Sequence, residues 1–420
     1  MKKIFIKTYG CSLNQADSEV MAGLLAESKR YKIIDNANDA DIVIINSCTV
    51  KNKSEIHFLS DIRKIKKPKV LAGCVPQAER DKKRFSCYSI IGTNDIGKIV
   101  EACDDTLCGK IVNFRENETA LRLNVAKIRK NEIIEIIPVS EGCLGACTYC
   151  KTKQARGNLY SYQPNQIVKH ACNAVKKGAK ELWLTSQDMG CYGKDINLSL
   201  PVLLEKISEI DGDFFIRVGM SNPNHVSEIL KELINAYKHP KLFKFLHIPL
   251  QSGNNDILKA MGRGYSVSDF SKIISEFRKN IPQVTIATDI ICGYPGESDA
   301  QFNDSVALVK NIRPDVLNIS RFWPRPDTHA ASLPQHHGRV TNARSRVLHR
   351  EFREIALIKN KEWIGTTCEI LIDEHGKNGI SIGRNNSYKQ VLVKGKYLLG
   401  KKLDVKVIGA TTYDLRAKVI

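Results

Sequence analysis

The fold is decided by the stretch Glu141-Gly142-Cys143-Leu144-Gly145-Ala146-Cys147-Thr148-Tyr149-Cys150. Its three cysteines are spaced CxxxCxxC and follow the apolar run 133–139, which is typical of a buried strand. Three close thiolates favour a soft metal, but a closed zinc site needs a fourth ligand, usually from a second CxxC, which this sequence lacks. In a 4Fe-4S cluster, three cysteines leave one iron open for another ligand. The spacing therefore predicts a catalytic cluster in a loop that leaves a strand.

The same loop resembles a known signature. CxxxCxxC with an aromatic residue, Tyr149, before the last cysteine is similar to the radical S-adenosylmethionine (SAM) signature. The resemblance implies that Cys143, Cys147 and Cys150 hold a 4Fe-4S cluster whose open iron is bound by the amino and carboxylate groups of SAM. The alternative is three cysteines crowded by chance.

Composition limits the remaining hypotheses. A chain of 420 residues with 42% hydrophobic residues predicts about two or three globular domains. No apolar run approaches the roughly 18 residues of a membrane span, and Lys7 interrupts the apolar start, so we expect a soluble, cytoplasmic protein without a membrane partner. Thirteen cysteines in such a chain indicate reduced thiols with metal or redox roles. The net charge of +19 indicates a polyanionic partner, although a solvated basic surface is the alternative.

The first predicted domain, residues 1–112, alternates apolar runs with helical patterns, and this predicts a doubly wound parallel sheet in an α/β fold. The strands predicted here are 4–6, 41–46 and 69–72. They are followed by Cys11, Cys48 and Cys74, which should converge at the carboxyl edge of the sheet as a second three-cysteine site; inert buried thiols are the alternative. We interpret the other seven cysteines as packing residues: Cys87, Cys103, Cys108, Cys172, Cys191, Cys292 and Cys368.

The second predicted domain, residues 129–358, follows a charged segment, 111–132, and again alternates strands and helices. Six strands are predicted, at 133–139, 181–185, 214–218, 245–248, 284–291 and 316–319. They indicate a partial (β/α)6 barrel whose chemistry lies at the carboxyl ends of its strands. Polar clusters follow four strands and together fit a SAM pocket, although each is also an ordinary turn pattern. The predicted cofactor contacts are Tyr149, Gln187, Asp188, Arg217, Gln251, Gly293 and Glu297. His247 is interpreted as structural.

The third predicted domain, residues 360–420, changes to a period of two, which predicts a small antiparallel β-barrel. Its predicted strands are 368–372, 390–393, 403–407 and 415–419. Basic residues interleaved with Tyr388 and Tyr397 suit phosphate tracking and base stacking. The predicted RNA contacts are Arg384, Lys389, Lys394, Lys396, Lys401 and Lys402.

The three domains together resemble the methylthiotransferases, which join a cluster-binding N-terminal domain, a radical SAM core and a C-terminal TRAM domain. The strings 9–12, 46–51, 71–77 and 147–153 are similar to the archaeal and eukaryotic branch, which converts N6-threonylcarbamoyladenosine next to the tRNA anticodon into its 2-methylthio derivative. The resemblance implies that Cys11, Cys48 and Cys74 hold an auxiliary 4Fe-4S cluster that carries the sulfur, and that SAM is both radical source and methyl donor.

The resemblance also implies three partners: tRNA, an electron donor of the reduced ferredoxin or flavodoxin type, and a sulfur donor. It assigns no catalytic residue beyond the cluster ligands. Two alternatives stay open. One is a methylthiotransferase acting on isopentenyladenosine in tRNA or on a ribosomal protein, and the other is an RNA-binding protein with structural or electron-transfer clusters.

Overall fold

The computed structural model describes residues 1–50, 52–81, 83–116 and 121–420. Lys51, the last residue of the string 46–51, and residues 117–120 of the charged segment lie outside the described residues. No helix in the described ranges is both long enough and apolar enough to cross a membrane.

The N-terminal domain is a parallel sheet of six strands in the order β2-β1-β3-β4-β5-β6. The strands are β1 (Lys2–Thr8), β2 (Tyr31–Ile33), β3 (Ile42–Ser47), β4 (Lys69–Gly73), β5 (Ser89–Ile91) and β6 (Asn113–Phe114). The central strand β3 is buried on both faces, with Ile42 and Ile44 on one side and Val43 and Ile45 on the other. This double burial explains its continuous apolar run.

Helices cover both faces of this sheet. α1 (Ser12–Glu27) and α4 (Ile99–Leu107) pack on the face of Ile44, while α2 (Asn52–Lys64) packs on the other through Phe58. α3 (Cys74–Gln77) is a short turn of helix directly after β4. The predicted doubly wound arrangement is confirmed.

The central domain has its six predicted strands, but they form two parallel sheets of three. The first holds β7 (Ile134–Pro138), β10 (Glu181–Thr185) and β11 (Phe215–Val218); the second holds β12 (Phe245–His247), β13 (Thr285–Cys292) and β14 (Val316–Arg321). A bridge between Ile216 and Leu242 and a hydrogen bond from Ser221 N–H to the His247 carbonyl (3.0 Å) connect them. A short pair, β8 (Ser140–Glu141) and β9 (Tyr160–Ser161), follows β7. The result is the partial barrel expected from the sequence.

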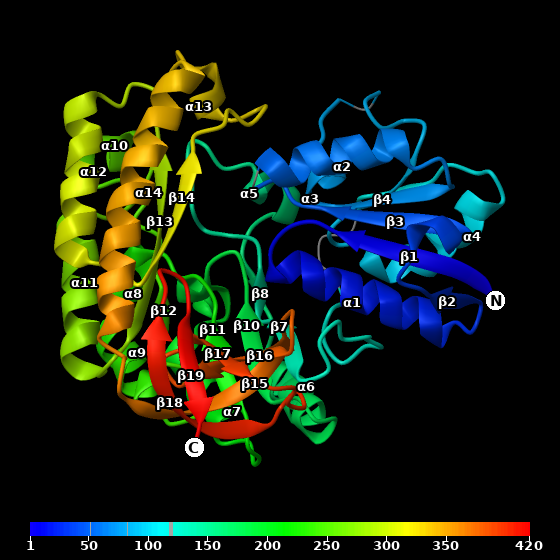
Figure 1. Ribbon diagram of the computed structural model, residues 1–420. Helices are drawn as coiled ribbons and strands as arrows, with labels where there is room; N and C mark the ends of the chain where they lie inside the picture. Colours follow the sequence, from blue (N-terminus) through cyan, green and yellow to red (C-terminus); the bar gives the residue numbers. More distant parts are fainter. Residues whose placement is uncertain (51, 82, 117–120) are drawn as a thin grey trace.

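Helices form the outer layer of this barrel (Figure 1). Their bounds are α6 (Pro164–Lys176), α7 (Leu200–Ser208), α8 (Pro223–Glu228), α9 (Leu230–Tyr237), α10 (Asn255–Ala260), α11 (Val267–Asn280), α12 (Asp299–Ile312) and α14 (Gly338–Lys361), with the short α5 (Thr152–Arg156) and α13 (His329–Ser332). Leu182 and Leu184 of β10 pack against the helices. Because side chains alternate along a strand, Trp183 between them points to the barrel interior.

The C-terminal domain is a closed barrel of five strands in the order β15-β16-β17-β19-β18. They are β15 (Thr367–His375), β16 (Ile380–Asn385), β17 (Gln390–Lys394), β18 (Lys402–Ala410) and β19 (Leu415–Val419). The sequence predicted four antiparallel strands and missed β16, and one pair, β17 with β19, runs parallel. An odd number of strands cannot alternate direction all the way around a closed ring, so one parallel pair is required.

The domains are placed so that the strand ends of the first two face each other. In Figure 1 the arrowheads of β1 and β3 point toward the central domain, and the C-terminal barrel is drawn over the lower part of the central domain. Ser12 at the start of α1 and Thr185 at the end of β10 share a hydrogen bond of 2.8 Å between their hydroxyl groups. The carboxyl edge of the N-terminal sheet therefore meets the carboxyl end of a barrel strand.

Candidate cluster and cofactor site

The CxxxCxxC loop lies beyond β7 and β8, at the carboxyl end of the barrel. Backbone N–H groups donate to two of its sulfurs: Gly145 to Cys143 Sγ (3.2 Å) and Thr152 to Cys150 Sγ (3.4 Å). Such donors stabilise thiolates, the form that binds metal.

Electrostatics disfavour three free thiolates in this loop. Burial raises the pKa of Cys143 to about 11, and the neighbouring Asp188, Cys147 and Cys150 add to the rise. Burial also raises the pKa of Cys150. A cationic metal centre would offset this repulsion, since metal binding deprotonates its cysteine ligands. The donor set therefore fits a metal cluster.

The loop is fixed by segments from the far side of the barrel. The Thr148 N–H donates to the Met261 carbonyl (3.0 Å), and the Thr148 carbonyl accepts from Ala330 N–H (2.9 Å). The Thr148 hydroxyl lies 2.8 Å from the Tyr294 hydroxyl. Tyr149, a predicted cofactor contact, packs edge-on against Tyr294, with ring centroids 6.5 Å apart.

Arg263, which the sequence reasoning missed, contacts the same loop. Its Nη1 donates to Cys147 Sγ (3.0 Å) and its Nη2 donates to Asn222 Oδ1. The predicted residue Asp188 orients Asn222: its carboxylate accepts from the Asn222 backbone N–H (3.0 Å) and side-chain amide (2.7 Å). Asp188 thus orients Asn222, which accepts from Arg263, and Arg263 in turn donates to Cys147 of the loop.

The other predicted cofactor residues differ in their surroundings. Gln187 has a buried Oε1 that finds no hydrogen-bond partner among the described residues, which suits a ligand contact. Gln251 has a left-handed φ of 72°, and its backbone bridges β13. Arg217 stacks over Trp183 (5.0 Å) and over Tyr388 of the C-terminal barrel (5.3 Å). Contacts of these three residues with SAM stay predictions.

Gly293 and Glu297 form a turn that holds α14. Glu297 accepts from the Gly293 N–H (2.7 Å) and from Arg344 Nη1 (2.8 Å). Gly293 has a φ of 74°, and a Cβ there would collide with Thr341 of α14. Their contact with SAM also stays a prediction.

His247 belongs to a polar row across the second sheet. Its Nε2 lies 2.9 Å from Asp289 Oδ2, and Asn318 donates to Asp289 Oδ1 (2.7 Å). This pairing agrees with the structural interpretation of His247. The sequence reasoning did not single out Asp289 or Asn318, because the row forms only when β12, β13 and β14 align.

The second cysteine set converges as expected. Cys11, Cys48 and Cys74 follow β1, β3 and β4, which are adjacent in the sheet. Cys11 Sγ lies 3.3 Å from Asn14 Oδ1, and Asn14 Nδ2 lies 3.9 Å from Cys74 Sγ. Gly10 has a φ of 132°, and a Cβ there would collide with Cys48 Cβ. Only glycine allows this approach.

In this set Cys11 favours the thiolate form, whereas Cys48 and Cys74 favour the thiol form. A hydrogen bond from Cys48 is the main reason that the pKa of Cys11 falls to about 6. Burial raises the pKa of Cys74, and the Cys11 hydrogen bond, then burial, raise that of Cys48. In the described ranges no group of three or more His, Cys, Asp or Glu side chains has the arrangement for a single metal ion. Three cysteines that each bind a different iron of a cluster do not need that arrangement.

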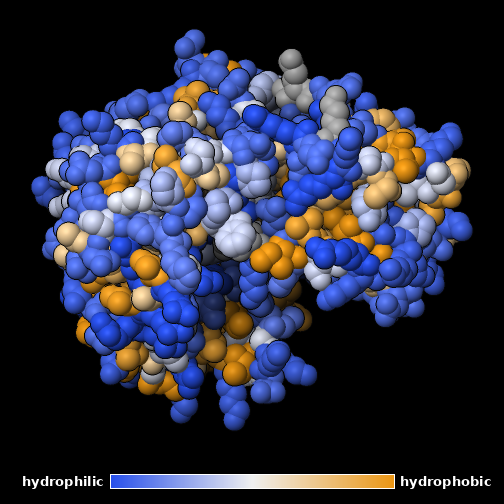
Figure 2. Space-filling model, turned by 90° about the horizontal axis from the view of Figure 1, so that it is seen from above, coloured by the Kyte–Doolittle hydropathy of each residue, from blue (hydrophilic) through white to orange (hydrophobic). Residues whose placement is uncertain are grey.

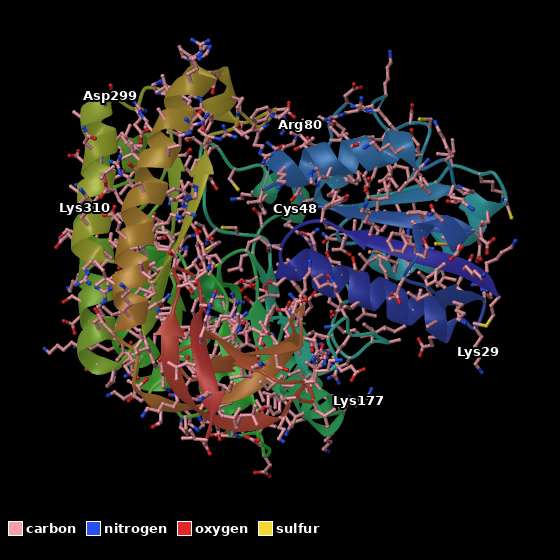
Figure 3. The ribbon with its side chains drawn as sticks, in the orientation of Figure 1. Lys29, Cys48, Arg80, Lys177, Asp299 and Lys310 are labelled. Carbon is pink, nitrogen blue, oxygen red and sulfur yellow. The ribbon has the colours of Figure 1, made fainter. Side chains whose placement is uncertain are left out.

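Both cysteine sets lie at one domain interface. Ala155 of α5, which follows Cys150 closely, packs with Cys74 and Ala78 of the N-terminal domain. Cys48, labelled in Figure 3, lies on the side of that domain facing the barrel. Buried Arg325 of the central domain donates to Glu55 (2.8 Å) and to the Val50 carbonyl (2.7 Å) across the same interface.

The predicted RNA contacts divide into two groups. Lys394, Lys396 and Lys401 are exposed. Lys389 is not on that surface: it is buried and donates to Asp315 Oδ1 (2.8 Å) and to Asn360 Oδ1 (3.0 Å). The prediction of Lys389 as an RNA contact is therefore wrong, because this lysine holds the barrel to the central domain.

Arg384 and Lys402 are also engaged within the chain. Arg384 Nε donates to Asp373 (3.0 Å), and Lys402 Nζ pairs with Asp213 (2.6 Å) and Glu369 (3.2 Å). Further exposed basic residues lie on α14 and on the outer face of β18 and β19: Arg339, Arg346, Arg350, Arg353, Lys406, Arg416 and Lys418. The view from above in Figure 2 shows a largely hydrophilic surface with scattered hydrophobic residues.

Family models match all three domains. The Radical SAM superfamily model matches residues 137–309, the model described as Uncharacterized protein family UPF0004 matches residues 3–88, and the TRAM domain model matches residues 361–420.

Curated relatives and solved structures agree with these matches. A threonylcarbamoyladenosine tRNA methylthiotransferase from Homo sapiens is 42% identical, covering 100% of this chain and 74% of the relative. A probable threonylcarbamoyladenosine tRNA methylthiotransferase from Pyrococcus abyssi is 42% identical over 94% of both chains. A radical SAM methyltransferase from Kitasatospora setae shares the fold, with a TM-score of 0.55 and 12% identity over 79% of this chain and 77% of that one. The chain belongs to the threonylcarbamoyladenosine tRNA methylthiotransferase family of radical SAM proteins.

Proposed function

We infer that this protein is a radical SAM enzyme that methylthiolates N6-threonylcarbamoyladenosine in tRNA, next to the anticodon, to give the 2-methylthio derivative. The observation that carries this inference is the pair of three-cysteine sets at one domain interface, linked by the contact of Ala155 with Cys74. Relatives with this activity in their names match the whole chain.

The reaction needs a radical because carbon 2 of adenine carries an unactivated C–H bond. When bound at Cys143, Cys147 and Cys150, a 4Fe-4S cluster and SAM supply that radical chemistry. The chain supplies the positioning. Gly145 and Thr152 donate to the thiolates, and Arg263 adds a charged donor to Cys147.

A second 4Fe-4S cluster at Cys11, Cys48 and Cys74 is part of the proposal. Three observations support it: the three thiols lie at adjacent strand ends, the pKa of Cys11 is lowered to about 6, and Gly10 permits close approach to Cys48. Held by these three cysteines, the auxiliary cluster would supply the sulfur that is inserted, and a second SAM would supply the methyl group.

The partners follow from this chemistry. The exposed basic residues of the C-terminal barrel and α14 suit the tRNA backbone. A reduced ferredoxin or flavodoxin and a sulfur donor are also required. None of the thirteen cysteines, all of which lie among the described residues, forms a disulfide, which suits a reducing compartment such as the cytoplasm.

The test uses two triple variants of the full chain, each compared with wild type. Converting Cys11, Cys48 and Cys74 to Ala should leave 5′-deoxyadenosine production intact but abolish the 2-methylthio nucleoside, as measured by liquid chromatography and mass spectrometry. Converting Cys143, Cys147 and Cys150 to Ala should abolish both products. Wild type should bind about eight irons and each variant about four.

Three outcomes would overturn parts of this proposal. A methylthiolated nucleoside formed by the first variant would remove the auxiliary cluster from the mechanism. Methylthiolation of isopentenyladenosine, or of a ribosomal protein instead of threonylcarbamoyladenosine, would change the substrate, and no SAM cleavage at all would leave an RNA-binding protein with structural clusters.

A further inference from the structure

A buried network of charges joins the N-terminal and central domains. Asp17 of α1 accepts from two arginines: Arg122 Nε (2.6 Å) and Arg156 Nη2 (2.7 Å). Arg122 also donates to Glu141 and to the Thr93 carbonyl. All four charged side chains are almost completely buried, with exposed fractions of 3% or less. Two carboxylates balance two guanidinium groups, so the network is neutral overall.

Arg122 and Arg156 differ in how many of their N–H donor atoms have a hydrogen-bond partner. Nε, Nη1 and Nη2 of Arg122 each have a hydrogen-bond partner in the chain. Arg156 uses only Nη2, while its Nε and Nη1 have no hydrogen-bond partner among the described residues although its side chain is 1% exposed. Unpaired donors on a buried cation are unfavourable unless a ligand satisfies them.

Arg156 lies beside the cysteines of the N-terminal domain, because the residue before it, Ala155, packs on Cys74. Its guanidinium is close enough to Cys74 and Cys11 for its positive charge to act on both sulfur atoms. The position is fixed by α5, because Ala155 packs on Cys74 and its carbonyl accepts from the Thr93 hydroxyl (2.6 Å). A residue of the central domain thus completes the wall of the N-terminal cysteine site.

We propose that Arg156 is a positioning residue for the auxiliary cluster, with its free Nε–H and Nη1–H donating to sulfur atoms of the cluster held by Cys11, Cys48 and Cys74. The proposal rests on the auxiliary cluster of the proposed function. Hydrogen bonds and positive charge beside the sulfurs stabilise the more negative reduced state and raise the reduction potential. The central domain therefore tunes a cluster whose ligands all belong to another domain.

The test isolates the auxiliary cluster in the full-length variant with Cys143, Cys147 and Cys150 replaced by Ala. Its one-electron reduction potential is measured by titration with dithionite, which donates the electron, and followed by electron paramagnetic resonance. Adding Arg156→Gln should retain iron and lower the reduction potential by at least about 59 mV, which corresponds to a tenfold change in the one-electron reduction equilibrium. Arg156→Lys keeps the charge but loses the planar fork, so a smaller shift is expected.

The matched control is Arg122→Gln, which breaks the same charge network but removes no donor that faces the thiols. It should weaken the domain interface in thermal unfolding and leave the potential unchanged. An unchanged potential in Arg156→Gln, or an equal shift in Arg122→Gln, would overturn the role of Arg156. If Arg156→Gln does not fold, Arg156→Lys decides in the same way. Absence of iron from the parent variant would instead refute the auxiliary cluster, and with it both proposals.

Discussion

At the scale of single residues, the placement of the cysteines was predictable and the side chains that contact them were not. The spacing of Cys143, Cys147 and Cys150 is a local signal, and Cys11 follows a recognisable strand. Arg263 and Arg156 gave no such signal, because their partners Cys147 and Asp17 lie more than a hundred residues away in the chain.

The contact of Arg263 with the cysteine loop gives a prediction. Arg263→Met removes the charged donor from Cys147 Sγ and from Asn222. Iron retention or SAM cleavage should fall about 10- to 100-fold, the usual effect of removing such a support. Iron content and 5′-deoxyadenosine formation check this.

The control for Arg263 is Lys310→Met, which changes an exposed side chain on α12, labelled in Figure 3. Wild-type values are expected for this variant. Equal iron content and cleavage in Arg263→Met and Lys310→Met would show that the Cys147 contact has no role.

At the scale of elements, the strands were predicted well because hydrophobic period and length identify them. The fifth strand of the barrel, β16, was missed: its sequence, Ile380–Asn385, contains Gly383 and few apolar residues. The sequence also could not show which outward-facing side chains of the barrel contact another domain, because the period of two only separates inward-facing from outward-facing positions. Lys389 was assigned to the surface for this reason.

Lys389, directly before β17, and Lys394, the last residue of β17, give a matched pair of predictions. Lys389→Met removes one of two lysines that pair with buried Asp315, so it should lower the free energy of unfolding by about 3 kcal/mol. Lys394→Met changes an exposed side chain and should alter it by less than about 0.5 kcal/mol. Urea unfolding of both variants checks this, and similar values would contradict the buried role of Lys389.

The contact of β10 with the C-terminal barrel predicts a pH dependence. Burial raises the pKa of Glu181 from 4.5 to about 7, and nearby Asp373 adds to the rise. The folded chain therefore keeps a proton that the unfolded chain releases, so stability should fall as the pH rises from about 4.5 to 7 and then level off. The loss from Glu181 alone is at most about 3 kcal/mol.

The variant Glu181→Gln tests this origin. Its amide oxygen can still accept from the Trp183 indole, which donates to Glu181 at 2.7 Å, but it does not titrate. Urea unfolding at pH 5 and pH 8 should show a smaller decline than in wild type, whereas the exposed control Glu205→Gln should keep the full decline. Identical slopes in all three proteins would remove Glu181 from the explanation.

At the scale of the whole molecule, the net charge of +19 indicated a polyanion but not where it binds. Two basic surfaces are now distinguishable: Lys394, Lys396 and Lys401 on the C-terminal barrel, and Arg346, Arg350 and Arg353 on α14. Converting either set to Gln should reduce the slope of log affinity for tRNA against log salt by roughly 0.7 to 0.9 per lost phosphate contact. If this slope is unchanged when one set is converted to Gln, the phosphate contacts with tRNA are assigned to the other set.

The interface between the first two domains also imposes an order of assembly. Cys48 and Cys74 are only 2% and 4% exposed, and α5 packs directly on Cys74. The auxiliary cluster that we propose at these thiols would therefore be inserted more readily before the domains close, or during transient opening of the interface. The yield of cluster-containing protein would then depend on whether cluster insertion is faster than closure of the domain interface. If the interface closes before the proposed cluster is inserted, the buried ion pairs that would shield the cluster from solvent instead hold the interface closed over a site without a cluster.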